Sequence, residues 1–95
     1  MSMLEVTEMI LASINAIPMK REEIDKLPYL KTISDFGIDF SIETLLKNGF
    51  IIEKIVDRHP YRTEEYRKKY GEVIRYKYRA TNKGRKYLQE HGYFD

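Results

Sequence analysis

Cysteine and tryptophan are absent from this 95-residue sequence, and glycine and proline are scarce, at 5 and 3 residues. Without cysteine the chain has no disulfide framework and no thiolate ligands, and its two histidines, His59 and His91, lie far apart in sequence. We therefore expect no bound metal. The scarcity of glycine and proline, with 42% apolar and 34% charged residues, is typical of a folded domain rather than a disordered tail.

The sequence also lacks an apolar run near the ~18 residues that span a bilayer, and it has no secretory signal pattern. We expect a cytoplasmic, intracellular protein without a membrane partner. A Gly-rich phosphate loop, a paired-carboxylate motif and a Ser-His arrangement are missing too, so we expect neither an enzyme nor a cofactor. Abundant Lys, Glu, Arg, Ile and Tyr without cysteine is typical of heat-adapted proteins, which suggests a thermophilic source.

Positive charge is concentrated in one part of the chain. Residues 1–53 carry 5 basic and 9 acidic side chains, residues 54–79 carry 9 and 4, and residues 80–95 carry 3 and 2. The net charges are therefore −4, +5 and +1. At this length we expect one domain over residues 1–95, with one surface directed at a polyanion.

Apolar spacing predicts two helices in the first 30 residues. The first covers residues 2–17 and stops at Pro18, with four apolar residues on one stripe: Val6, Ile10, Ile14 and Ile17. The second covers residues 21–27 and ends before Pro28, with Ile24 and Leu27 facing inward.

A third helix is predicted, but its start is ambiguous. In a longer version it covers residues 34–48 with Ser34 as its cap, and in a shorter version Gly37 ends a preceding turn and the helix starts at Asp39. We prefer the longer version because the apolar spacing persists toward its N-terminal end. Its inward residues would be Ile38, Ile42, Leu45 and Leu46. Gly49 supplies a left-handed stop.

Beyond Gly49 the pattern becomes that of β-strands. Residues 50–56 are rich in branched side chains, and residues 72–80 alternate, so that Arg75, Lys77 and Arg79 share one face. The segment between the strands is predicted either to contain a short helix or to be disordered without a ligand. A last helix begins at Thr81 or Asn82 and runs to about residue 90, with Tyr87 and Leu88 inward.

The predicted element order is therefore α-α-α-β-β-α, an α+β fold with a long hairpin over about residues 50–80. Two segments resemble winged helix-turn-helix proteins, the MarR- and PadR-type transcriptional regulators. TLLKNGFI, residues 44–51, is similar to the end of their recognition helix, and YRATNKGRKYL, residues 78–88, to the return of their wing into the last helix. The resemblance covers roughly residues 20–90. It implies a homodimeric regulator whose third helix enters the major groove while the wing touches phosphate or the minor groove.

From this we predict binding of double-stranded DNA. Cations against phosphates release condensed counterions, and the hairpin offers eight candidates: Arg58, Arg62, Arg67, Lys68, Lys69, Arg75, Lys77 and Arg79. The resemblance carries over three further residues of the third helix: Ser41, Thr44 and Lys47. The alternative is a solvated hairpin in which Glu64, Glu65 and Glu72 neutralise these cations.

The third helix departs from the regulators in its outward residues. Phe36, Phe40 and Glu43 stand where groove readers present Arg, Lys, Asn or Gln. Paired aromatics are typical of protein contacts, so the alternative function is a protein-interaction module of a transcription or replication complex, with a partner at Phe36 and Phe40.

A dimer interface is predicted from apolar residues outside the main stripe. Leu4 and Leu11 widen the apolar face of the first helix, and Tyr93 and Phe94 form an aromatic tail. The alternative is that Leu4 and Leu11 are ordinary core residues.

Overall fold

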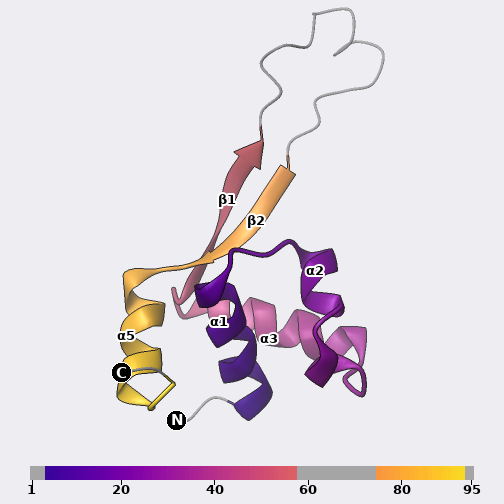
Figure 1. Ribbon diagram of the computed structural model, residues 1–95, viewed down its shortest axis with the longest axis horizontal. Helices are drawn as coiled ribbons and strands as arrows, with labels where there is room; N and C mark the ends of the chain where they lie inside the picture. The colour runs from indigo at the N-terminus through magenta and orange to yellow at the C-terminus, as the bar shows by residue number, and fades with distance from the viewer. Residues whose placement is uncertain (1–3, 58–74, 94–95) are drawn as a thin grey trace, which may run out of the picture.

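The computed structural model describes residues 4–57 and 75–93, with residues 55–57 and 75 described for their backbone only. This part has an α+β architecture, as predicted, with four α-helices and one two-stranded antiparallel hairpin. The helices are α1 Glu5–Ala16, α2 Arg21–Asp25, α3 Asp35–Lys47 and α5 Asn82–Glu90, with a short 3-10 helix, η1, at Pro28–Leu30; the strands are β1 Ile51–Asp57 and β2 Arg75–Ala80. Figure 1 shows the strands rising out of the helical layer.

The first two helices are shorter than their apolar spacing predicts. α1 ends at Ala16, and Ile17 takes an extended conformation (φ −144°) with its side chain exposed, so its predicted place on the buried stripe is wrong. Pro18 explains the early end, because the residue before a proline is disfavoured in the helical region. α2 ends at Asp25, and η1, which the sequence did not predict, follows directly at Pro28.

α3 follows the longer of the two predicted versions. The Ser34 side chain accepts a hydrogen bond from the backbone N–H of Gly37 at 3.1 Å, which satisfies a donor of the first turn. At the other end Gly49 adopts φ +73°, the left-handed stop that only glycine adopts freely. The bounds of α3 are therefore fixed locally at both ends.

A single residue from the segment between α1 and α2 pairs with the free edge of the hairpin. β1 pairs with β2 in a register that sets Ile51 opposite Ala80 and Lys54 opposite Lys77. On the other edge of β2, Met19 forms an antiparallel bridge with Tyr78, with N–O distances of 3.1 and 2.7 Å between the two backbones. The strand pair is therefore attached to the helices along β2.

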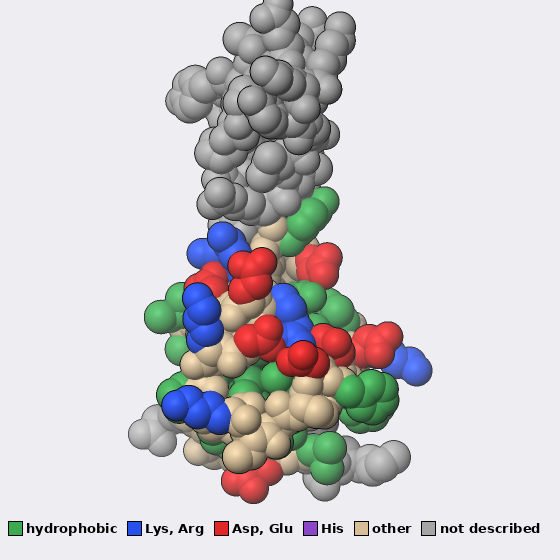
Figure 2. All heavy atoms as spheres, turned by 90° about the vertical axis from the view of Figure 1, so that its right-hand side faces the viewer, with side chains coloured by type: hydrophobic (Ala, Val, Ile, Leu, Met, Phe, Trp, Pro, Cys, Tyr) green, Lys and Arg blue, Asp and Glu red, His purple; other side chains and the backbone are tan. Residues whose placement is uncertain are grey.

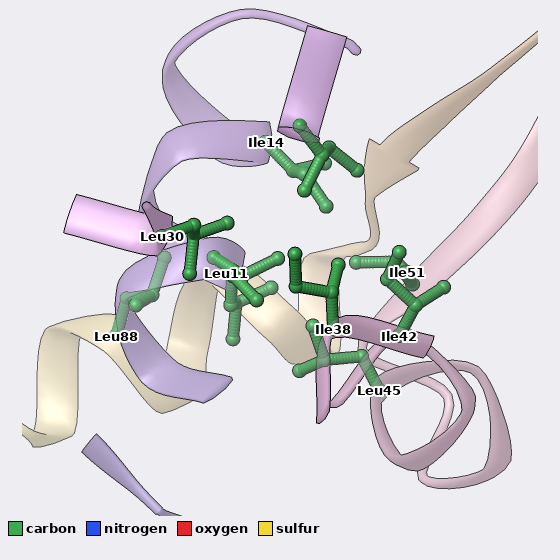
Figure 3. Close-up of a cluster of buried hydrophobic side chains, with 10 residues drawn as sticks. Leu11, Ile14, Leu30, Ile38, Ile42, Leu45, Ile51 and Leu88 are labelled. Carbon is green, nitrogen blue, oxygen red and sulfur yellow. The ribbon is translucent and has the colours of Figure 1, made fainter. Parts of the chain in front are cut away.

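The hydrophobic core draws one or more residues from every element except β2 (Figure 3). Its ten buried members are Ile10, Leu11, Ile14, Ile24, Leu30, Ile38, Ile42, Leu45, Ile51 and Leu88. Burial of each such side chain contributes roughly 1.5–3 kcal/mol. Leu11 is 0% exposed, so its predicted role in a dimer interface is wrong: its side chain is already enclosed by the chain's own core.

α5 is locked to the root of the hairpin. The Thr81 hydroxyl donates to the carbonyl of Gly49 at 2.6 Å, and the Thr81 N–H donates to the carbonyl of Phe50 at 2.9 Å. A Cβ on Gly84 would lie 2.3 Å from the Phe50 oxygen, so only glycine fits there. The segments 44–51 and 78–88, far apart in sequence, therefore meet at this joint.

Candidate nucleic-acid interface

The hairpin has two chemically different faces, and its register determines which residues share each. Ile51 and Glu53 lie opposite Ala80 and Tyr78, and this inner face packs on the core. The other face carries four residues, which we call the outer face: Ile52, Lys54, Lys77 and Arg79. Successive residues alternate between the faces, so the outer face points away from the core.

The outer face brings like charges together. Lys54 lies directly opposite Lys77, and Arg79 lies two residues further along β2, opposite the exposed Ile52. Like charges directly opposite each other destabilise a strand pair. Among residues 51–54 and 76–80 the only acidic residue is Glu53, on the inner face. The outer face therefore lacks a neutralising partner within this stretch and would favour an anion placed against it.

Basic side chains continue from the hairpin into the first half of α5. Lys83, Arg85 and Lys86 are all exposed and form no ion pair within the described residues. The Lys83 ammonium lies 5.4 Å from the ring centroid of Phe50, and the Arg85 Nε donates to the Asn15 side chain at 3.1 Å. Lys83 therefore lies at the hairpin root, and Arg85 lies beside α1.

The structure places part of the predicted hairpin site. Lys77 and Arg79 are on the outer face as predicted. The backbone of Arg75 begins β2, but its side chain lies outside the description, as do five further predicted residues: Arg58, Arg62, Arg67, Lys68 and Lys69. Lys54 was not predicted. Its alternation within residues 50–56 gave a signal, but its partner depends on the register, which the sequence does not show.

The surface where the hairpin meets the start of α2 has mixed charge. A groove of about 480 Å³ is lined by Lys20, Arg21, Glu22, Glu53, Tyr76, Lys77 and Tyr78. Burial raises the pKa of the Tyr78 hydroxyl above its ordinary value, and the nearby Glu53 carboxylate raises it further. Tyr78 therefore stays neutral at physiological pH, and the groove's carboxylates offset its cations.

The third helix does not present all the residues predicted for DNA contact. Ser41 is 1% exposed, and its hydroxyl accepts a hydrogen bond from Thr7 of α1 at 3.0 Å, so its assignment as a base contact is wrong. The Thr44 hydroxyl donates to the Phe40 carbonyl within the same helix at 2.8 Å. Lys47 alone of the three is exposed, and Thr44 is half-buried.

Acidic side chains dominate the exposed part of α3. Asp35, Asp39 and Glu43 are exposed against one cation, Lys47. Arg21 of α2 neutralises Asp39 through a hydrogen-bonded ion pair with 2.8 Å between its Nε and the carboxylate, and Arg21 also pairs with Asp25. Figure 2, which views the side of the molecule that carries α2, shows acidic and basic side chains next to one another. Phosphates would be repelled by this helix rather than attracted.

Two phenylalanines of α3 are exposed, as predicted. Phe36 is 80% exposed and Phe40 is 53% exposed. Beside them lies a groove of about 600 Å³ lined by Phe40, Glu43, Thr44, Leu46 and Lys47. Exposed large aromatics next to a groove are typical of contact surfaces between proteins.

Of the remaining residues of the predicted dimer interface, two are exposed and one lies outside the described residues. Leu4 precedes α1 and is exposed, and Tyr93 follows α5 and is also exposed, whereas Phe94 lies outside the described residues.

Within residues 4–57 and 75–93, no group of three His, Cys, Asp or Glu side chains could hold a metal ion. No helix of that same part is long and apolar enough to cross a membrane.

No protein-family model, curated protein or solved structure was found to match this chain.

Proposed function

We propose that this chain is a double-stranded DNA-binding protein of the winged helix-turn-helix type, in which the outer face of the hairpin binds the phosphate backbone. The observation that carries the proposal is the Lys54–Lys77 pair, joined by Arg79 on the same face, with no acidic residue on that face among residues 51–54 and 76–80. Such an arrangement costs stability in the free protein. Polyanion binding would offset that cost and release condensed counterions from the DNA.

The winged helix-turn-helix assignment is supported by three features. The described elements follow the predicted order, and Met19 adds a third backbone segment to the hairpin. The two segments that resemble transcriptional regulators meet where Thr81 binds Gly49. In this arrangement the hairpin is the wing, and the protein would act in transcription regulation.

We expect α3 to contribute little to DNA affinity. Its exposed carboxylates, Asp35 and Glu43, oppose phosphate, and Ser41 is buried under α1. We therefore propose that the wing holds the duplex with limited sequence preference, because phosphate contacts carry no base information.

The experiment that tests this proposal is fluorescence anisotropy with labelled duplex DNA over a series of salt concentrations. Affinity should fall steeply with salt, with a log-log slope of roughly −0.9 for each phosphate contact. Lys54→Ala should reduce the slope by about one unit, whereas Lys31→Ala, an exposed cation away from the hairpin, should leave it unchanged. Absence of binding at low salt would overturn the proposal.

A second candidate function is a protein-interaction module, which the exposure of Phe36 and Phe40 favours. In this case α3 docks on another protein while the hairpin is free for DNA, so the two functions are compatible. Phe40→Glu should then abolish the protein interaction and leave DNA affinity unchanged. If Phe40→Glu alters neither the assembly state nor any partner interaction, this candidate is wrong.

A further inference from the structure

One stripe of α3 is left without a partner in the described structure. It consists of Phe36, Phe40, Glu43 and Lys47, at positions i, i+4, i+7 and i+11, which we call the outward stripe. The buried residues Ile38, Ser41, Ile42 and Leu45 are on the opposite side of the helix. The outward stripe therefore points away from the core along the whole helix.

The two ends of the outward stripe differ in shape and in charge. The phenylalanines occupy the N-terminal half of α3, whereas four of the five residues that line the adjacent groove come from its C-terminal half: Glu43, Thr44, Leu46 and Lys47. Asp35, at the N-terminal end, makes no ion pair within the described residues, and Lys47 is the only cation of the helix. One half thus offers aromatic side chains and an anion, and the other half offers a groove and a cation.

These halves match each other when a second copy lies antiparallel across the helix. The spacing of the stripe is the same read in either direction, so Phe36 of the second copy meets Lys47 and Phe40 of the second copy meets Glu43. Both incoming rings then face residues that line the groove. The reverse contacts are identical, as a two-fold axis requires.

Charge complementarity favours the same arrangement. Lys47 would lie beside the ring of Phe36 and the carboxylate of Asp35 of the second copy, which combines a cation–π contact with an ion pair. A parallel pairing would instead set Lys47 against Lys47 and Asp35 against Asp35.

We propose that the outward stripe of α3 is the contact between two copies of this chain, paired antiparallel around a two-fold axis. This inference concerns assembly and does not depend on DNA binding, because it uses neither the outer face nor α5. It also moves the expected dimer interface from α1 to α3. A 13-residue helix is about 20 Å long, and stable interfaces bury about 800 Å² per partner, so we expect a reversible dimer.

Sedimentation velocity of the full chain without DNA, over a wide range of protein concentration, tests the proposal. The average mass should rise from that of the 11.4 kDa monomer toward that of a dimer as concentration increases. Phe36→Glu should weaken dimerisation at least tenfold, and Phe40→Gln provides an independent variant if that chain folds poorly. Leu4→Glu, at an exposed apolar residue outside α3, is the matched control and should leave the dimer intact.

Exchanging the charges of Lys47 and Asp35 distinguishes the antiparallel pairing of α3 from other ways in which two copies could meet. Lys47→Glu should weaken the dimer, and the combination of Lys47→Glu with Asp35→Lys should restore it. Circular dichroism of each variant checks that the fold is kept. The proposal is overturned if the wild-type chain stays monomeric, if Leu4→Glu rather than Phe36→Glu breaks the dimer, or if the charge exchange restores nothing.

Discussion

The outer face of the hairpin and the exposed side of α3 carry charges of opposite sign. The outer face of the hairpin carries Lys54, Lys77 and Arg79 with no carboxylate, whereas the exposed part of α3 carries Asp35, Asp39 and Glu43 against Lys47. The hairpin also packs on the core through Ile51, Tyr78 and Ala80, while α3 buries Ile38, Ser41, Ile42 and Leu45 on one side. One region suits a polyanion and the other suits a protein surface.

In winged helix-turn-helix proteins the third helix reads bases in the major groove, and our proposal for this chain reverses that division. In this chain the positive charge lies on the outer face of the hairpin, and α3 presents two exposed aromatic side chains. DNA affinity and any protein contact would then rest on separate surfaces, and each can be changed without the other.

The largest effect is expected from charge reversal on the outer face. Lys54→Glu combined with Lys77→Glu should weaken duplex DNA binding roughly 100-fold at low salt, because two phosphate contacts become repulsions. The matched control makes the same charge change at two exposed lysines outside the hairpin, Lys26→Glu with Lys31→Glu. Anisotropy titrations compare the two. Equal losses would mean that only net charge matters and that the outer face is not a site.

The joint that carries the hairpin gives the next effect. Gly84→Ala should lower the free energy of unfolding by about 2–3 kcal/mol, because the new Cβ would lie 2.3 Å from the Phe50 carbonyl oxygen, which cannot move without shifting the root of β1. Gly37→Ala is the control, since its Cβ would meet side-chain atoms alone, the Cγ2 of Ile33 at 3.0 Å and the Oγ of Ser34 at 3.5 Å. Urea unfolding of both variants measures the difference. A Gly84→Ala chain as stable as wild type would contradict the rigid joint.

The buried hydrogen bond between Thr7 of α1 and Ser41 of α3 should affect the stability of the fold but not DNA affinity. Ser41→Ala should cost about 1–2 kcal/mol of unfolding free energy, because it leaves the buried Thr7 hydroxyl without its partner. DNA affinity of the folded chain should not change. Adding Thr7→Val should recover part of the lost stability. A weaker DNA complex with unchanged stability would instead return Ser41 to the DNA interface.

The smallest effect is expected at the single cation of α3. Lys47→Ala should change duplex DNA affinity less than roughly twofold, since the neighbouring carboxylates keep phosphate away from this helix. The same anisotropy assay at low salt measures it. A tenfold loss would show that α3 approaches the backbone and would remove the contrast between the two regions.

The sequence predicted the elements whose ends are set by local chemistry. Ser34 and Gly49 mark the two ends of α3 as expected. Thr81 caps α5, and its side chain accepts a hydrogen bond from the backbone N–H of Gly84. η1 and the bridge at Met19 were missed, because a single 3-10 turn and a one-residue pairing leave no periodic pattern. Ile17 was placed on the buried stripe because the prediction ended the helix at Pro18 and did not apply the constraint that a proline places on the residue before it.

The sequence predicted the residues of the candidate site only where the pattern within a single strand or helix places them together. Alternation along β2 placed Lys77 and Arg79 together, but Lys54 joins them only through the register of β1. Ser41 was assigned to DNA contact from the resemblance to transcriptional regulators, although its spacing from Ile38 and Leu45 put it on the inward side of α3. Its hydrogen-bond partner, Thr7, lies 34 residues away.

The central claim is that the hairpin, and not α3, meets DNA. Mapping of backbone amide chemical shifts by NMR during titration with duplex DNA at low salt tests this most directly. Perturbations should concentrate in β1 and β2 around Lys54, Lys77 and Arg79, with the amides of Phe36 to Lys47 unchanged. Perturbations along α3 with an unaffected hairpin would contradict the account.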